Sequence, residues 1–129
     1  MLIDHIEIPV ADRERSRQFY ETALAPLGVA CVVSIPAAQS AAGTPRHGLG
    51  RDGYPCLWLH GGEPTPGGIH IAFTAGDRAV VAAFHVAALD AGGRDNGAPG
   101  IRTRYHPSYY AAYILDPDGN NIECVGQAE

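Results

Sequence analysis

The sequence contains no lysine, since all nine of its basic residues are arginine. Without lysine the chain cannot form a Schiff base with a carbonyl substrate, and it cannot contain a Walker P-loop, whose lysine reaches the phosphates. Fourteen acidic residues give a formal net charge of −5, which argues against binding to nucleic acid or to an anionic membrane. Schiff-base enzymes and P-loop proteins are therefore excluded, and proteins that bind nucleic acid or anionic membranes are disfavoured.

Cysteines and long apolar runs are also scarce. The three cysteines, Cys31, Cys56 and Cys124, are odd in number and widely separated, so neither a disulfide framework nor a cysteine zinc site is indicated. No apolar run reaches the length of a membrane span, and the N-terminal residues lack the basic and apolar stretches of a signal peptide. We therefore expect a cytoplasmic protein with reduced thiols.

The remaining composition is that of one globular domain. The chain has 129 residues, of which 46% are hydrophobic and 18% are charged. This length closes one hydrophobic core but is short for two independent domains. We therefore expect a single domain over residues 1–129.

An internal repeat with an offset of 65 residues organises this domain. Residues 5–28 match residues 70–93 at eight positions, where about two matches are expected by chance. The identical pairs are His5/His70, Ile6/Ile71, Asp12/Asp77, Arg13/Arg78, Phe19/Phe84, Ala23/Ala88, Leu24/Leu89 and Gly28/Gly93. A segment rich in Gly and Pro lies between the copies, so we divide the chain into module one (1–60), a linker (61–68) and module two (69–129).

Each module is predicted to contain a strand, a helix and about three further strands. Alternating apolar residues predict the first strands, Asp12 and Asp77 are candidate N-caps of the helices, and glycines end those helices. The later strands are expected at 30–35, 46–50 and 54–60 in module one, and near Arg102, at 109–115 and at 120–125 in module two. Residues 37–45 and 92–100 are expected to be long loops. The fold class is therefore α+β.

Three side chains with metal-ligand chemistry occupy related places in the repeat. His5 and His70 open the two modules, and Glu123 lies on the polar face of the last strand, at the position that Trp58 occupies in module one. If these strands lie side by side around a pseudo-twofold axis, two imidazoles and a carboxylate converge. Such a set suits Zn, Fe, Mn, Ni or Co. The alternative is that each residue is an ordinary solvent-facing side chain of a half-exposed strand.

These features resemble the vicinal oxygen chelate superfamily, which includes glyoxalase I, fosfomycin-resistance proteins, extradiol dioxygenases, methylmalonyl-CoA epimerase and bleomycin-resistance proteins. The resemblance covers nearly the whole chain. It rests on the duplicated modules, on the His-Ile pair that opens each, and on the run Leu-Asp-Pro-Asp-Gly-Asn-Asn-Ile-Glu at residues 115–123. It implies glyoxalase-like βαβββ modules that form an incomplete eight-stranded barrel around a metal, and it implies a homodimer.

The resemblance also places His5, His70 and Glu123 at the family's metal-ligand positions. In glyoxalase I the end of the first module supplies a fourth ligand, usually a carboxylate, whereas this chain has Trp58 there. The set of three ligands is more similar to that of the dioxygenases and fosfomycin-resistance enzymes. It leaves coordination positions open for water or a bidentate substrate.

Part of the extradiol dioxygenase signature is present as well. The matching residues are His106, Tyr113, Asp116 to Gly119 and Glu123. The chain departs from that signature at Arg104, where a small or β-branched residue is usual, and at Ala112, where a larger aliphatic residue is usual. Those enzymes are also usually twice as long, so the resemblance to them is partial.

Four further residues are candidates for proton transfer. The resemblance implies that Tyr113 points toward the metal, where its phenol could hydrogen-bond a substrate oxygen, and the alternative is a core tyrosine. Glu7, on the strand face of His5, is a candidate general base or an exposed glutamate. His60 and His106 are candidate acids or bases, and the alternative for both is a surface histidine.

The expected substrate pocket contains Trp58, Tyr105 and Arg104. Aromatic side chains there could stack on a ligand, and Arg104 with Arg102 could attract an anionic group. The remaining histidines, His47 and His85, are expected at the surface.

We therefore predict a small metal-dependent enzyme, whose divalent ion on His5, His70 and Glu123 chelates neighbouring oxygens of a small substrate. Dioxygenase, lyase or isomerase, and thiol-transferase chemistry all remain open. The alternative is a metal-free binding protein of the bleomycin-resistance type, which sequesters an aromatic or cationic molecule. A third possibility is an inactive partner or regulatory module.

Overall fold

The structure is a computed structural model that describes residues 2–127. In chain order its helices and strands are β1 (Ile6–Val10), α1 (Arg13–Leu24), β2 (Ala30–Ile35), β3 (Arg46–Arg51), β4 (Tyr54–Gly61), β5 (His70–Thr74), α2 (Arg78–Asp90), β6 (Arg94–Ile101), β7 (Tyr110–Leu115) and β8 (Asn121–Gly126). Two short 3-10 helices, Ala25–Leu27 and Ala37–Gln39, complete the elements. No helix in this part of the chain is both long and apolar enough to span a membrane.

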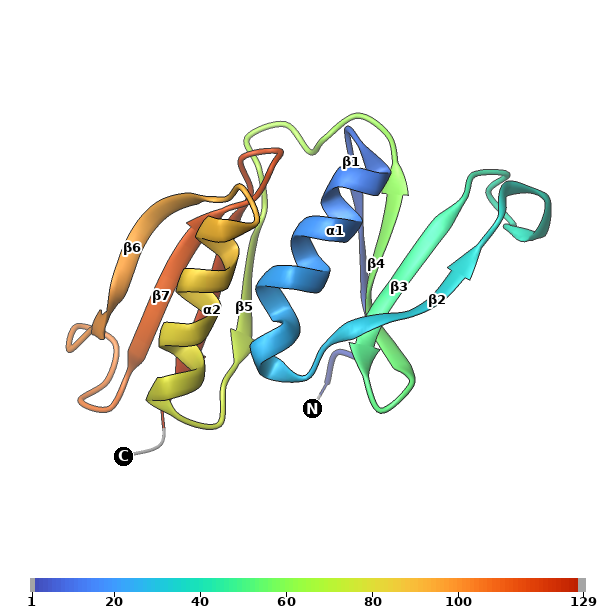
Figure 1. Cartoon of the computed structure of the whole chain (residues 1–129). Coiled ribbons are helices and arrows are strands. Elements are labelled where there is room, and N and C mark those ends of the chain that lie inside the picture. The colour runs from blue at the N-terminus through green and yellow to red at the C-terminus, as the bar shows by residue number, and fades with distance from the viewer. Residues whose placement is uncertain (1, 128–129) are drawn as a thin grey trace.

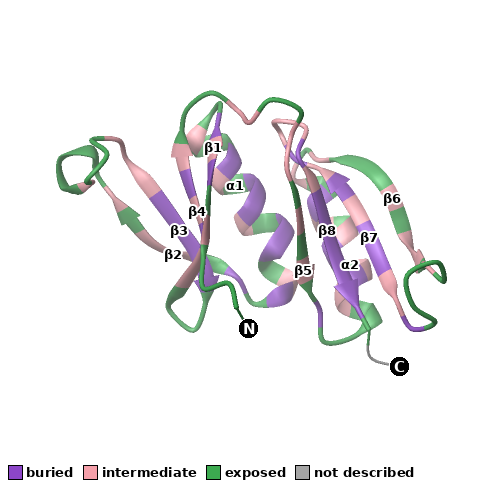
Figure 2. Ribbon diagram, turned by 180° about the vertical axis from the view of Figure 1, so that it is seen from behind, coloured by how far each residue is buried: buried purple, intermediate pink, exposed green. Residues whose placement is uncertain are grey.

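The strands form two four-stranded sheets of the same topology. Sheet A has the order β1-β4-β3-β2 and sheet B the order β5-β8-β7-β6, with the first strand of each module parallel to the last. Helices α1 and α2 lie together on one side of the sheets, and the opposite faces of the sheets are visible from behind (Figures 1 and 2). The predicted α+β fold of two βαβββ modules is confirmed, although the strands of residues 2–127 do not close into a barrel.

The strand registers reproduce the sequence repeat. Ile6 pairs with Leu57 in sheet A, and Ile71 pairs with Ile122 in sheet B, so both members of the pair are displaced by the same 65 residues. The two helices begin in the same way, because Asp12 and Asp77 each accept a hydrogen bond from the backbone of the first helical turn. The duplicated sequence therefore folds as two equivalent modules.

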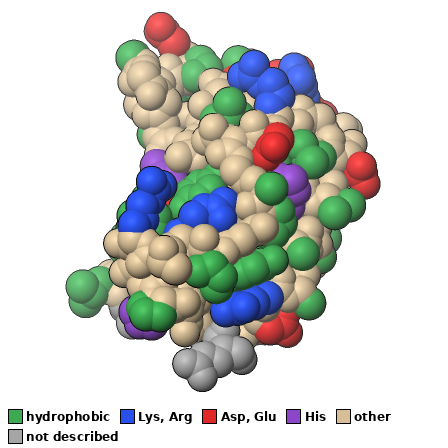
Figure 3. Space-filling view, turned by 90° about the vertical axis from the view of Figure 1, so that its left-hand side faces the viewer, with side chains coloured by type: hydrophobic (Ala, Val, Ile, Leu, Met, Phe, Trp, Pro, Cys, Tyr) green, Lys and Arg blue, Asp and Glu red, His purple; other side chains and the backbone are tan. Residues whose placement is uncertain are grey.

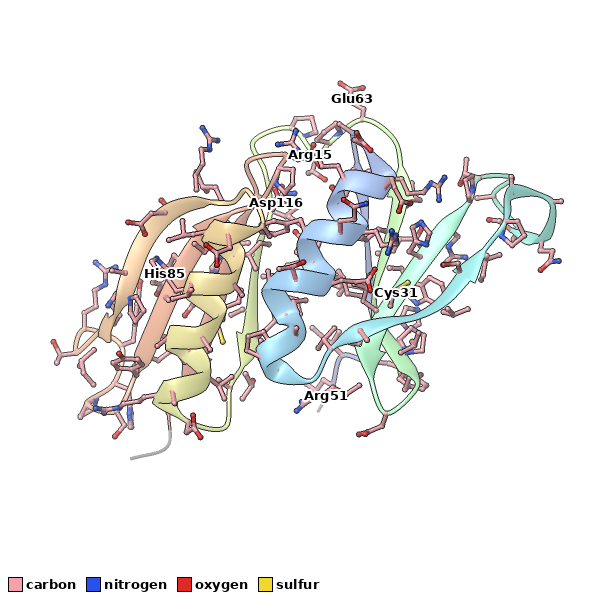
Figure 4. The ribbon with its side chains drawn as sticks, viewed as in Figure 1. Arg15, Cys31, Arg51, Glu63, His85 and Asp116 are labelled. Atoms are coloured by element: carbon pink, nitrogen blue, oxygen red, sulfur yellow. The ribbon has the colours of Figure 1, made fainter. Side chains whose placement is uncertain are left out.

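One hydrophobic core joins the modules. The fully buried aromatic residues Phe19 of α1 and Phe84 of α2 belong to a single cluster between the helices and the sheets. A polar contact adds to this packing: the Tyr20 hydroxyl of α1 donates to Asp116 in the turn after β7, which lies toward α1 in Figure 4. Asp116 is 2% exposed and also accepts from Asn120, so its buried charge is stabilised by hydrogen bonds. The Asp-Pro-Asp-Gly-Asn run thus ties module two to module one.

Two expectations from the sequence are wrong. Residues 92–100 were expected to be a loop, but β6 covers most of them. Its register shifts twice, near Gly97 and Gly100, and it contains Pro99. An edge strand tolerates register shifts and a proline because one of its sides needs no hydrogen-bonding partner. These features also disrupt the alternating pattern by which a strand is recognised in a sequence.

His47 was expected at the surface but is buried in β3. Its Nε2 lies 2.7 Å from an Arg13 guanidinium nitrogen and its Nδ1 lies 2.8 Å from the Ser34 hydroxyl. Because arginine only donates, Nε2 accepts and the ring is neutral. Burial lowers the pKa of His47 below its usual value of 6.5, and the neighbouring Arg13 adds to this. His85 is half-buried and lies 3.0 Å from a carboxylate oxygen of Asp95.

Candidate functional site

A pocket of about 500 Å³ lies on the face of sheet B that is turned away from α2. Its lining residues all come from module two: His70, Asn96, Arg104, Tyr105, Tyr109, Tyr113, Asn121 and Glu123. Strand alternation explains the placement. In β8 the apolar Ile122 and Cys124 are buried in the core, so Asn121 and Glu123 face the opposite side.

The centre of the pocket is the pair His70 and Glu123. The Nδ1 atom of His70 lies 2.9 Å from the carbonyl oxygen of Asn121, and only a protonated nitrogen can donate to a carbonyl. A neutral ring would therefore direct the lone pair of Nε2 toward the Glu123 carboxylate, whose Oε1 lies 3.1 Å away. Two electron-rich atoms at this distance require a positive charge between them. Either a proton lies between the two atoms or they share a metal cation.

Two tyrosines surround this carboxylate. The Tyr109 hydroxyl donates to Oε2 of Glu123 at 2.5 Å, which leaves Oε1 for His70. Burial, followed by that hydrogen bond, raises the pKa of Tyr109 far above its usual value of 10.0. Burial and the charge of Glu123 also raise the pKa of Tyr113, whose ring lies stacked 6.4 Å from His70. Both phenols therefore remain protonated at neutral pH and act as hydrogen-bond donors.

The segment between β6 and β7 forms a basic and aromatic wall. The Arg104 guanidinium lies 4.9 Å from the ring centre of Tyr105, and the rings of Tyr105 and Tyr109 are 5.0 Å apart. The Arg102 guanidinium lies 5.4 Å from the ring centre of Tyr113 and donates to the carbonyl oxygen of Ala98. The wall therefore combines positive charge with stacked rings.

The sequence alone identified five of the eight residues that line the pocket. His70, Glu123, Tyr113, Tyr105 and Arg104 were candidates, whereas Tyr109, Asn96 and Asn121 were missed. Asn121 could have been found, because it shares the alternating face of Glu123. Tyr109 could have been found as well, because it shares the alternating face of Tyr113 in the predicted strand at 109–115. Asn96 could not, since it lies on the unrecognised β6.

His5 does not join His70 and Glu123 within one chain. It precedes β1, its side chain is about half exposed, and its Nδ1 lies 2.6 Å from Oδ1 of Asp4, which also accepts from Tyr54. The strands β1 and β5 belong to different sheets, so the side-by-side pairing that would bring both imidazoles together is absent from residues 2–127. No group of three His, Cys, Asp or Glu side chains in that range is close enough to hold a metal.

Glu7, His60 and Trp58 form a separate cluster on the corresponding face of sheet A. The Glu7 carboxylate contacts an Arg46 guanidinium nitrogen at 2.7 Å through one oxygen and His60 Nδ1 at 2.7 Å through the other. Arg46 also lies over the Trp58 ring, 4.6 Å from its centre. In one chain these residues lie outside the pocket of module two, and the carboxylate of Glu7 is engaged on both oxygens.

His106 is exposed and lies outside the residues that line the pocket. Its Nδ1 accepts a hydrogen bond from the backbone N–H of Ser108 at 3.1 Å, so the ring stabilises its own turn. The structure therefore gives His106 a local structural contact, whereas Tyr105 and Arg104 line the pocket as expected.

The geometry of His70 and Glu123 suits two adjacent ligands of one divalent ion. Bonds of about 2.0–2.2 Å at angles near 90–110° place two donor atoms about 3.0–3.4 Å apart. The separation of Nε2 and Oε1, 3.1 Å, lies in this range. The bond from Nδ1 to a backbone carbonyl is also the usual way in which a metal-binding histidine is oriented. Residues 70 and 123 therefore fit a metal, and a third protein ligand has to come from elsewhere.

The family of the chain follows from a comparison with protein-family models. Residues 2–124 match the Glyoxalase/Bleomycin resistance protein/Dioxygenase superfamily. The chain belongs to this superfamily. No curated protein matches it at a significant level.

Solved structures with the same fold span different functions. A glyoxalase/bleomycin resistance protein from Albidiferax ferrireducens has 25% identity and a TM-score of 0.76, with 98% of each chain covered. A glyoxalase I variant from Zea mays has 22% identity and a TM-score of 0.67, with 95% of this chain and 46% of that chain covered. The antibiotic-binding protein TnmS3 from a Streptomyces species has 20% identity and a TM-score of 0.67, with 99% and 97% covered. The superfamily fold is thus shared by enzymes and by a binding protein.

Proposed function

We propose that this chain is a small metal-dependent enzyme in which His5, His70 and Glu123 hold a divalent ion against vicinal oxygens of a small substrate. The observation that carries the proposal is the pair formed by His70 Nε2 and Glu123 Oε1, 3.1 Å apart, with the remaining atoms of both side chains tied by hydrogen bonds. The expected ion is Zn, Fe, Mn, Ni or Co, because these accept both imidazole and carboxylate ligands.

We further propose that the third ligand is His5 of a second copy, so that the active form is a homodimer. His5 stands in module one where His70 stands in module two, and its side chain is half exposed at the edge of sheet A. A second copy that laid its sheet A against this sheet B would bring His5 to the exposed side of the pocket. The ligand positions that the resemblance to the vicinal oxygen chelate superfamily implies, one in module one and two in module two, support this proposal.

The chain's own residues would prepare the site for chemistry. The carbonyl of Asn121 fixes the His70 tautomer, and Tyr109 fixes the orientation of Glu123. Tyr113, protonated at neutral pH and stacked beside His70, would donate a hydrogen bond or a proton to a substrate oxygen. When bound, the metal would act as a Lewis acid that stabilises negative charge on that oxygen. Dioxygenase, lyase or isomerase, and thiol-transferase reactions are all compatible with these roles.

Metal content tests the proposed site. Protein purified without chelator or metal-affinity tag, and soaked with Fe, Mn, Ni or Zn, should contain about one metal per chain by elemental analysis. Glu123→Gln keeps the shape of the side chain and should remove most of that metal, whereas Glu63→Gln, in the exposed segment after β4, should not. Equal metal content in the wild type and E123Q would refute the site.

Mixed dimers test the second copy. The variants H5Q and E123Q should each lose the metal, and a heterodimer purified through one Strep tag and one FLAG tag should hold one metal per dimer. One of its two sites combines the intact His5 of one copy with the intact Glu123 of the other. If His5 served its own chain, the heterodimer would stay empty. If H5Q alone kept full metal content, His5 would not be a ligand.

A metal-free binding protein is the second candidate. The same His70 and Glu123 contact forms an ordinary ion pair when the imidazole is doubly protonated, and three tyrosines line the pocket. The fold of an antibiotic-binding protein is similar to this one. An absence of metal after every soak, combined with binding of a small aromatic molecule in the pocket, would favour this function.

A further inference from the structure

We infer that the pocket of module two takes an aromatic or similarly planar carboxylate, with the anionic group held by Arg104 and the ring against Tyr105 and Tyr109. The inference rests on the proposed function in that it takes this pocket as the substrate site. It does not require the metal. The net charge of −5 would by itself favour a cationic ligand, so the argument depends on the local charges.

The arginines of the wall lack acidic partners. Among residues 2–127, Arg17 and Arg46 form ion pairs with carboxylates within 4.0 Å, and the other seven arginines, Arg102 and Arg104 among them, form none. Arg104 lines the pocket and is exposed. In the view onto the left-hand side of Figure 1, basic side chains lie beside hydrophobic ones around a recess (Figure 3). Two unpaired guanidinium groups next to one pocket favour an anionic ligand.

The backbone of β6 makes room for the second guanidinium. A Cβ atom at Gly100 would lie 2.9 Å from Nη1 of Arg102, and one at Gly97 would lie 3.3 Å from Nη2. The two glycines therefore allow the Arg102 side chain to fold back over Tyr113, where Nη2 donates to Ala98. This placement adds positive charge behind the ring of Tyr113, beside the site of Arg104.

The rings determine the expected shape of the ligand. Tyr105 is 56% exposed, although its ring contacts Tyr109 and Arg104. An exposed ring at the edge of a pocket offers a stacking surface for a flat molecule. Such a molecule buries apolar area against Tyr105 while its carboxylate meets Arg104.

The Glu123 carboxylate at the centre of the pocket fixes the orientation of the ligand. A ligand carboxylate placed against the Glu123 carboxylate, whose Oε2 accepts from Tyr109, would be repelled. The anionic end therefore points to Arg104, and any further oxygens of the ligand point to His70 and Glu123. The pocket thus distinguishes the two ends of its substrate by charge.

A pair of isosteric probes tests this inference on metal-free protein. Benzoate and its neutral analogue benzamide would be titrated into ¹⁵N-labelled protein at low ionic strength, and the chemical shifts of the backbone amides would be followed. A ligand of this size is expected to bind with a Kd of about 1 mM, so shifts are a suitable measurement. We expect benzoate to shift the amides of Tyr105, Tyr109 and Glu123 and to bind about tenfold more tightly than benzamide. Added salt should weaken the binding of benzoate and leave the binding of benzamide unchanged.

Matched variants identify the arginine. Arg104→Gln should weaken the affinity for benzoate about tenfold without affecting the affinity for benzamide. Arg104→Lys should lose less affinity for benzoate than Arg104→Gln, because lysine keeps the positive charge. Arg94→Gln is the control, because it makes the same charge change on exposed β6 outside the pocket. Equal affinity for the two probes, equal losses in R94Q and R104Q, or the absence of benzoate binding to folded protein would overturn the inference.

The metal experiment separates this inference from the proposed function. If E123Q loses its metal while benzoate fails to bind, the metal site stands and the anion site is wrong. If benzoate binds through Arg104 and no metal binds under any condition, the anion site stands and the enzyme proposal is wrong.

Discussion

Trp58 occupies in module one the position that Glu123 occupies in module two. Trp58 pairs with Glu7 of β1 and Glu123 pairs with Ala72 of β5, in the same register displaced by 65 residues. Across the next strand, Trp58 pairs with Gly48 and Glu123 pairs with Tyr113. Module one thus has an indole over a glycine where module two has a carboxylate beside a phenol. Equivalent positions of the two modules therefore carry an aromatic contact in module one and a polar one in module two.

Opposite consequences are predicted for mutations at these two equivalent positions. Trp58→Ala should lower the free energy of unfolding by about 2 kcal/mol, because the indole packs on Gly48 and under Arg46, and it should leave metal content unchanged. Glu123→Gln should lower metal content with a smaller loss of stability. Urea unfolding and elemental analysis of both variants check this prediction. Loss of metal in a folded W58A protein would contradict it.

Tyr109 is predicted to position Glu123 rather than to bind the metal. Tyr109→Phe removes the hydrogen bond to Oε2 and should weaken metal affinity about tenfold, the usual scale for such a supporting contact. Tyr105→Phe, at the exposed neighbouring ring, is the control and should not change the affinity. Competition with a fluorescent chelator measures both. An unchanged affinity in Y109F would show that Glu123 is oriented without it.

The irregular backbone of β6 is predicted to be sensitive at Gly97. Its φ of +152° is unfavourable for other residues, and a Cβ there would lie 2.8 Å from Cδ1 of Tyr113. Gly97→Ala should therefore destabilise the fold by about 2 kcal/mol. Gly61→Ala is a suitable control because a Cβ at Gly61 meets open space and needs no positive φ. Thermal unfolding of both variants checks the difference, and equal melting temperatures would contradict it.

Buried His47 is predicted to destabilise the protein in acid. Its pKa is lowered in the folded state by burial and by the charges of Arg13 and Arg17, which Glu14 and Glu21 oppose in part. As the pH falls below 6.5, the unfolded chain binds the proton first, so stability is lost until the pH passes the folded pKa. The contribution of His47 to the free energy of unfolding is therefore fully present only above about pH 6.5.

The variant His47→Gln isolates this effect from the contributions of the other histidines. The urea midpoints of wild type and H47Q would be compared at pH values of about 7.5 and 5.5. The wild type should lose more stability than H47Q over this interval. A larger loss in H47Q would show that the charged form of His47 is tolerated in the fold.

The sequence by itself determined the duplicated architecture and part of the site. The identical residues at an offset of 65, the capping aspartates and the alternating strands are local signals, and local signals fix secondary structure and which side chains share a face. For this reason His70 and Glu123 could be assigned to one face before any contact was known. The Gly- and Pro-rich β6 was missed because its strand pairing compensates for a poor local pattern.

Only the tertiary structure decided which candidates meet. The pairing of β5 with β8 brings His70 to Glu123, and the separation of the two sheets leaves His5 outside, although the repeat makes both histidines equivalent. The contact of Tyr109 with Glu123 joins the segment before β7 to β8, and the pattern of one strand does not reveal its neighbour. Contacts between residues far apart in the chain depend on how the elements pack, and packing is a property of the whole core.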